Sequence, residues 1–201
     1  MRVFLGASTE ELDINDIRFD CFEQTQHVHL EGYLLYIDDG QFLKKVIKKA
    51  KEKGTTVSLD FGSYEVVNRY KNFILQLLAQ REVDIVFANE DEINMLTGFG
   101  PEEGCKELKK LCNIAVVTAG KRGCWAANET ECIHTPALPA KVVDTTGAGD
   151  FFEAGFLHGF VSGKDLKTCA TYGNLLGKSA VEVLGTQLSN QRWKELRSFL
   201  N

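Results

Sequence analysis

The segment best suited to chemistry runs from Asp144 to Asp150, with the sequence DTTGAGD, and joins an extended stretch to a helix. Gly147 and Gly149 allow backbone angles and a close approach that side chains would block. The N–H groups of a helix's first turn have no intrahelical acceptor and lie at the positive end of the helix dipole. The segment therefore predicts a cradle for a phosphate, or for the charge that builds up on a phosphoryl group in transfer.

The two carboxylates of this segment also have a purely structural interpretation. Asp150 would be a first-turn acid that interacts with the helix dipole, and Asp144 a cap or turn residue. A single glycine-rich turn before a helix is common. The full string D-T-x-G-A-G-D, however, is expected by chance only about once in 10⁵ chains of this length, which favours a functional role.

The elements that must position this turn follow from the alternation of short apolar runs with longer amphipathic stretches. Strands that alternate with helices of crossover length predict an α/β fold, a doubly wound and mostly parallel sheet with flanking helices. No linker or repeat is visible, so residues 1–201 are expected to form a single domain. We expect strands at 2–7, 27–33, 55–60, 83–88 and 114–118, a hairpin at 124–128 and 131–135, and helices at 41–53, 65–80, 91–97, 101–112, 149–162, 166–184 and 191–200.

Polar residues end three of the expected strands, namely Asp60, Asn89 and Thr118. Ligands of such sheets lie beyond the carboxyl ends of the strands, so these positions are candidates for a site. Asn89 has an alternative role as the cap of the helix that follows, for which asparagine is a preferred residue. Asp60, like His27 and His29 on an earlier strand, is expected to be structural.

Composition narrows the function classes. The formal net charge of −5 argues against a general nucleic-acid or anionic-membrane binder. No apolar run approaches the length of a membrane span. The six cysteines form no C-x-x-C pair and show no zinc-site spacing with histidine, which predicts reduced thiols, mostly in the core, and a cytoplasmic location. There is no P-loop and no early G-x-G-x-x-G, which discourages an unrelated nucleotide-binding fold.

The 144–150 string resembles the C-terminal fingerprint of the ribokinase-like (PfkB) family of carbohydrate and nucleoside kinases. Three other segments resemble family motifs in the same order: VSLDF at 57–61, the N-x-x-E pattern at 89–92, and the T-x-G-x-x-G turn at 118–123. The phrases HVHLEGYLLY and VDIVFANEDE are similar to plant-type members. The resemblance covers essentially the whole chain and implies the ribokinase-like fold.

The resemblance also implies a reaction. Asp150 would be the base that takes the proton from an acceptor hydroxyl as that hydroxyl attacks the γ-phosphate of ATP. The N–H groups of Gly147, Ala148 and Gly149 would form the anion hole. An oriented hydroxyl, a metal that offsets charge and donors aimed at the transferring group are what phosphoryl transfer needs. The implied acceptor is a small sugar or nucleoside.

The remaining implied site residues would hold the nucleotide and its ion. Asn89 and Glu92 would help to hold Mg²⁺ and its waters near the phosphates of ATP. Gly120 and Gly123 could equally be hairpin-turn glycines, and Asn174 and Gly177 could serve helix packing. The nucleotide residues that the resemblance implies are Thr118, Gly120, Gly123, Asp144, Thr145, Thr146 and Asn174.

The chain departs from the family in its length. Family members are longer, and we expect this chain to lack the N-terminal third, which carries the lid and most of the acceptor site. Two hypotheses follow: an ATP-dependent kinase of a small alcohol, or a truncated, catalytically silent protein that acts by nucleotide binding or protein contacts. The sheet edge that such a loss would expose predicts possible self-association.

Overall fold

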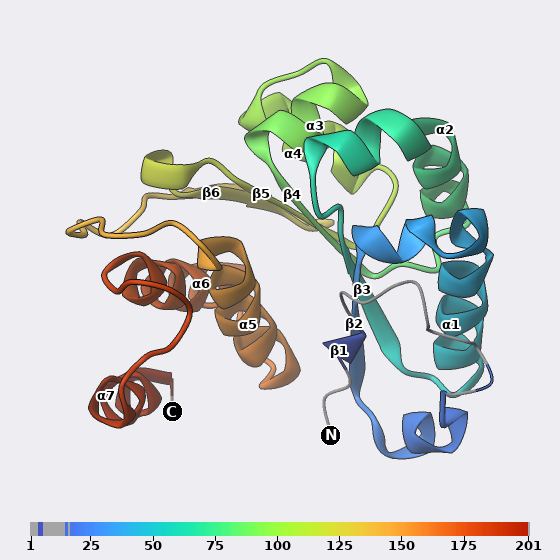
Figure 1. Cartoon of the computed structure of the whole chain (residues 1–201). Coiled ribbons are helices and arrows are strands. Elements are labelled where there is room, and N and C mark those ends of the chain that lie inside the picture. Colours follow the sequence, from blue (N-terminus) through green and yellow to red (C-terminus); the bar gives the residue numbers. More distant parts are fainter. Residues whose placement is uncertain (1–3, 6–14, 16, 201) are drawn as a thin grey trace. The chain divides into compact units, whose positions relative to one another are not determined.

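The computed structural model describes residues 4–5, 15 and 17–200, and its contacts divide the chain into two compact units. The first unit comprises Met1–Val117 and Ala127–Glu131, and the second comprises Thr118–Ala126 and Cys132–Asn201 (Figure 1). Each unit is described by itself. The expectation of a single domain over residues 1–201 stays a prediction.

The first unit is built on strands that follow one another in sequence order across the sheet. β1 pairs with β2, β2 with β3 and β3 with β4, all in parallel, with Val28 opposite Val57 and Leu59 opposite Val86. These side chains are fully buried, as expected for parallel strands covered on both faces. The strands are β1 (Phe4–Leu5), β2 (His27–Glu31), β3 (Thr56–Asp60), β4 (Ile85–Asn89) and β5 (Ile114–Thr118).

Four α-helices accompany these strands, and Figure 1 shows α1 and α2 on the same side of β2 and β3. In α1 the side chains of Phe42, Leu43, Val46, Ile47 and Ala50 are buried, whereas the lysines lie on the other face. Gly54 follows the end of α1 with a φ of +73°, a conformation in which glycine has no steric penalty. The helices are α1 (Gln41–Glu52), α2 (Tyr64–Ala79), α3 (Glu90–Thr97) and α4 (Pro101–Lys109).

The strand expected at 27–33 is wrong at its C-terminal end. β2 stops at Glu31, and the chain turns into a 3-10 helix over Gly32–Tyr36. A Cβ atom on Gly32 would lie 2.0 Å from the Phe61 carbonyl oxygen, so only glycine allows the chain to pass this close to the end of β3. The strand expected at 2–7 is confirmed at Phe4–Leu5, and its other residues lie outside the described part of the chain.

The two histidines of β2 are structural, as predicted. His27 is hydrogen-bonded through Nδ1 to the Thr56 hydroxyl and through Nε2 to the Ser58 hydroxyl, both at 2.8 Å. His29 Nδ1 lies 2.7 Å from the same Ser58 oxygen. These bonds link neighbouring parallel strands and satisfy polar groups that would be costly to bury alone.

The second unit consists of a hairpin and three helices. The strands β6 (Cys124–Ala127) and β7 (Cys132–Thr135) are neighbours, as predicted. α5 (Ala148–Val161) and α6 (Leu166–Val181) pack along each other, and α7 (Asn190–Leu200) adds Leu196 and Leu200 to a cluster with Leu176 and Leu188. Within this unit the described elements match the expected ones to within a few residues at their ends.

The cysteines behave as small core residues, as expected, at four of their six positions. Cys105, Cys112, Cys124 and Cys169 are buried, Cys21 is half-buried and Cys132 is exposed, and all six are free thiols. Burial raises the pKa of the Cys112 and Cys124 thiols to about 12, which keeps them protonated and unreactive. None of the helices that the structure describes is both long and apolar enough to cross a membrane.

Candidate active site in the second unit

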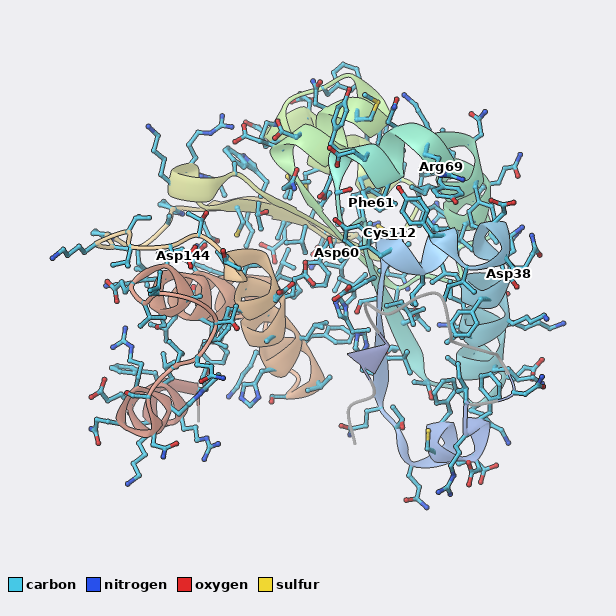
Figure 2. All side chains as sticks on the ribbon, in the orientation of Figure 1. Asp38, Asp60, Phe61, Arg69, Cys112 and Asp144 are labelled. Carbon is cyan, nitrogen blue, oxygen red and sulfur yellow. The ribbon has the colours of Figure 1, made fainter. Side chains whose placement is uncertain are left out.

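The 144–150 turn is a compact, internally bonded structure (Asp144 is labelled in Figure 2). Asp144 Oδ1 accepts hydrogen bonds from the Thr146 N–H at 2.9 Å and the Thr146 hydroxyl at 2.8 Å. Its Oδ2 accepts the Gly185 N–H at 2.9 Å, which ties the turn to the segment after α6. The hydrogen bonds from the Thr146 and Gly185 N–H groups lower the pKa of Asp144, so this carboxylate stays ionised as a brace of the turn.

Gly147 begins α5 from a left-handed conformation, with a φ of +76°. A Cβ atom at this position would also lie 2.9 Å from Thr186 Cγ2. Both the backbone angle and the neighbour therefore require glycine. At Gly149 a Cβ atom would meet nothing within 4 Å, so the space above the first turn of α5 is open.

The first turn of α5 presents free N–H donors to that space. The Ala148 N–H donates to the Thr145 carbonyl at 3.2 Å, and the Phe151 N–H donates to the Gly147 carbonyl at 3.0 Å. Among the residues that the structure describes, the N–H groups of Gly147, Gly149 and Asp150 have no acceptor. The predicted anion cradle thus has its free donors at Gly147, Gly149 and Asp150, with Ala148 partly engaged. The Asp150 side chain is exposed in the same turn.

A pocket of about 550 Å³ lies entirely within the second unit and reaches this turn. We call it the α5–α6 pocket. It brings together many of the residues singled out from the sequence: Thr118, Gly120, Gly123, Thr145, Ala148, Gly149, Asn174 and Gly177. Asp144, Thr146, Gly147 and Asp150 belong to the adjoining turn and are not part of its lining. Its other lining residues are Lys121, Ala137, Leu138, Pro139, Ala140, Val142, Phe152, Lys178 and Val181.

One wall of the α5–α6 pocket is a stripe on α6. Asn174, Gly177, Lys178 and Val181 recur at the spacing that places residues on one helix face. Gly177 lies against α5, since a Cβ atom there would be 3.4 Å from the Ala148 carbonyl oxygen, which is about an ordinary van der Waals contact. Its role in the nucleotide site stays a prediction.

Asn174 shapes the opposite wall. Its side-chain amide donates to the carbonyl oxygens of Thr135 and Pro136, at 3.1 and 3.0 Å. These bonds hold the start of the 136–142 segment, whose Ala137, Leu138 and Pro139 line the pocket. None of the sequence motifs indicates this segment, although an apolar stretch with two prolines beyond the last strand is typical of an ordered segment without strand partners.

The turn after β5 forms the third side of the pocket. Gly120 and Gly123 have φ values of +52° and +89°. A Cβ atom on Gly123 would lie 2.1 Å from the Thr135 carbonyl oxygen, so glycine lets β7 pass close to this turn. Gly120 has open space around it and lines the pocket. Both glycines are turn residues and pocket residues at once.

Asn89 and Glu92 lie in the first unit, where they form a capping box at the start of α3. Asn89 Oδ1 accepts the N–H groups of Asp91 and Glu92, both at 2.9 Å. Glu92 Oε2 accepts the Asn89 N–H at 2.8 Å, and Glu92 Oε1 accepts the Asn89 side-chain amide at 2.7 Å. The interpretation of Asn89 as a cap is therefore realised. The role of Asn89 and Glu92 in holding Mg²⁺ and its waters stays a prediction. The described residues contain no group of three His, Cys, Asp or Glu side chains that could hold a metal ion.

Glu92 should make folding stability depend on pH. Burial raises its pKa from 4.5 to about 7, and the Asn89 N–H bond offsets only part of this effect. An acid whose pKa is higher in the folded state than in the unfolded state destabilises the fold as pH rises between the two values. As pH rises from 4.5 to 7, the wild type should lose up to about 3 kcal/mol of unfolding free energy through Glu92. Glu92→Gln should not show this loss. Urea unfolding of both proteins across this range measures the difference, and parallel pH profiles would contradict it.

Comparison with known proteins places these features in a family. The sequence matches the pfkB family of carbohydrate kinases over residues 3–193. It is 26% identical to an uncharacterized sugar kinase of Archaeoglobus fulgidus and 28% identical to a nucleoside kinase of Methanocaldococcus jannaschii. These alignments cover 89% and 95% of the chain, but 68% and 59% of the two relatives. The chain thus spans about three fifths to two thirds of their length.

Solved structures agree with the fold. A probable sugar kinase from Rhizobium etli superposes with a TM-score of 0.87 at 29% identity, over 95% of this chain and 59% of the other. An adenosine kinase from Sinorhizobium meliloti gives a TM-score of 0.86, also at 29% identity, over 94% and 59%. A putative ribokinase II from E. coli, solved with ATP and Mg²⁺, shares the fold at 22% identity with a TM-score of 0.79. The predicted α/β fold, with a mostly parallel sheet and flanking helices of ribokinase-like type, is confirmed.

The motifs occur in the order that the resemblance implied, and the turn before α5 lies within the matched residues. Because the match spans nearly the whole sequence, the chain belongs to the pfkB family of carbohydrate kinases.

Proposed function

We propose that this chain is an ATP-dependent phosphotransferase that transfers the γ-phosphate to a hydroxyl group of a small sugar or nucleoside. The observation that carries the proposal is the α5–α6 pocket, which ends on a helix N-terminus with unused N–H donors. The pocket would hold the nucleoside part of ATP. The free N–H groups of Gly149 and Asp150 would then meet the phosphoryl group that is transferred.

Asp150 takes the role of the general base in this proposal. Its exposed carboxylate stands in the same helical turn as the N–H donors, so a hydroxyl that approaches the phosphoryl group along the helix axis comes within its reach. The carboxylate accepts the hydroxyl proton as the oxygen attacks phosphorus. Asp144 takes no part in proton transfer; it braces the turn through Thr146 and Gly185.

Mg²⁺ would enter with the nucleotide. This ion prefers phosphate oxygens and water to an all-protein cage, and it supplies charge neutralisation on the phosphates when bound. The phosphates of ATP would therefore supply the first ligands of the ion. Each Glu92 oxygen accepts one hydrogen bond in the capping box and keeps a further lone pair, so the predicted role of this side chain towards the ion or its waters is compatible with the cap.

The test is acceptor-dependent ADP formation by the purified chain with Mg·ATP and a panel of sugars and nucleosides. Turnover that requires one acceptor class supports the proposal. Nucleotide binding without turnover for any acceptor would favour the second hypothesis, a silent nucleotide-binding protein. If calorimetry detected no ATP binding, the kinase hypothesis would fail for the α5–α6 pocket, and only a silent protein that acts by protein contacts would remain.

A further inference from the structure

The α5–α6 pocket is positively charged although the protein carries a net charge of −5. Among the described residues that line it, only Lys121 and Lys178 bear a formal charge, and no carboxylate is present. The two lysines come from different elements, the turn after β5 and helix α6. Two cations at the edge of an otherwise uncharged pocket would favour a nucleotide, which carries phosphates, over a neutral nucleoside.

Lys178 forms only a loose ion pair with a carboxylate, without a hydrogen bond. Its Nζ lies 3.9 Å from Glu182 Oε1, beyond hydrogen-bonding distance. Arg192 of α7 lies closer, with a guanidinium nitrogen 3.3 Å from Glu182 Oε2. The same nitrogen also donates to the Ser179 hydroxyl at 3.2 Å. Arg192 therefore holds Glu182, and in the described part of the chain the Lys178 ammonium donates no hydrogen bond.

We propose that Lys178 is a specificity-determining residue that binds the phosphate chain of the nucleotide, and that Arg192 is a positioning residue that keeps Glu182 from neutralising it. This inference rests on the proposed function of the α5–α6 pocket and names a residue that the motifs of the sequence did not indicate. Lys178 follows Gly177, which lies against Ala148 at the phosphate-binding turn. Lys178 lines the same pocket as Ala148 and Gly149 of that turn.

A surface ion pair is the simplest alternative role for Lys178. Pairs of this kind at i and i+4 contribute little to stability, and they need close contact. The side chains of Lys178 and Glu182 are only 28% and 29% exposed, so the charges are less screened than on an open surface. A half-buried lysine that lines a pocket and is only loosely paired with Glu182 keeps the capacity to bind an anionic ligand.

The experiment compares ATP, ADP and adenosine binding to the intact chain by calorimetry, for the wild type, Lys178→Gln and Lys167→Gln. Lys167 is exposed on α6 outside the pocket, so its change removes the same charge from the same helix. We expect Lys178→Gln to weaken ATP and ADP binding about tenfold and to leave adenosine binding unchanged. Lys167→Gln should match the wild type.

Two results would overturn the inference alone: equal ATP affinity of Lys178→Gln and Lys167→Gln, or an equal loss for ATP and adenosine. Absence of ATP binding by the wild type would instead overturn the proposed function, and the inference with it. The role of Arg192 is tested by a second pair of variants. Arg192→Gln should weaken ATP binding about threefold. Adding Glu182→Gln should restore the ATP affinity, because no carboxylate then competes for Lys178. A loss that Glu182→Gln does not restore would show a structural role only.

Discussion

Replacement of Asp150 by asparagine should lower acceptor-dependent turnover by about 10²–10⁴-fold, the usual contribution of a positioned base. The amide keeps the shape of the carboxylate but cannot accept the hydroxyl proton. Because the side chain is exposed and makes no packing contact that asparagine would lose, we expect ATP affinity and the melting temperature to change little. Steady-state kinetics, ATP calorimetry and thermal unfolding of the same preparation measure the three quantities.

Asp165→Asn is the matched control for this change. Asp165 caps α6 by accepting the Thr168 N–H at 2.7 Å, and asparagine caps helices about as well as aspartate. The variant therefore removes a negative charge from a helix N-terminus away from the pocket, and turnover should stay near the wild-type value. If Asp150→Asn kept most of its turnover, or if both variants lost activity equally, Asp150 would not be the base.

Replacement of Gly155 by alanine should destabilise the second unit by about 1–2 kcal/mol net, because overpacking a contact this close costs about 3 kcal/mol. A Cβ atom on Gly155 would lie 2.4 Å from the Tyr172 carbonyl oxygen and 2.7 Å from its carbonyl carbon. These are backbone atoms of α6, so the two helices must separate to admit the methyl group. The gain in helix propensity, about 1 kcal/mol, offsets only part of this cost.

Gly149→Ala is the control for this prediction, because it adds the same methyl group to the same helix with nothing within 4 Å of it. Thermal unfolding should show a lower melting temperature, by roughly 5–10 °C, for Gly155→Ala and no loss for Gly149→Ala. Equal melting temperatures for the two variants would mean that α5 and α6 are not held at the distance described. Since both helices line the pocket, Gly155→Ala should weaken ATP binding as well.

The sequence by itself determined the order and type of most elements. Buried parallel strands appear as continuous apolar runs, and amphipathic helices such as α1 show their buried stripe directly. It also indicated the glycine turn before α5, because the left-handed backbone angle at Gly147 is a local requirement at the start of a helix. The sequence also indicates the helix cap at Asn89, because a capping box spans only four residues and is visible as a local pattern.

Only the tertiary structure decided which distant residues share a site. β2 ends at Glu31, where Gly32 passes close to the Phe61 carbonyl just beyond the end of β3, and no pattern within residues 27–33 predicts that approach. Asn174 is hydrogen-bonded to the start of the 136–142 segment. Lys178 lines the pocket, and Arg192 is hydrogen-bonded to Glu182. Each of these facts depends on contacts between segments that are far apart in the chain or on the burial of one helix face. Propensity and periodicity describe neighbours along the chain, whereas a pocket is defined by neighbours in space.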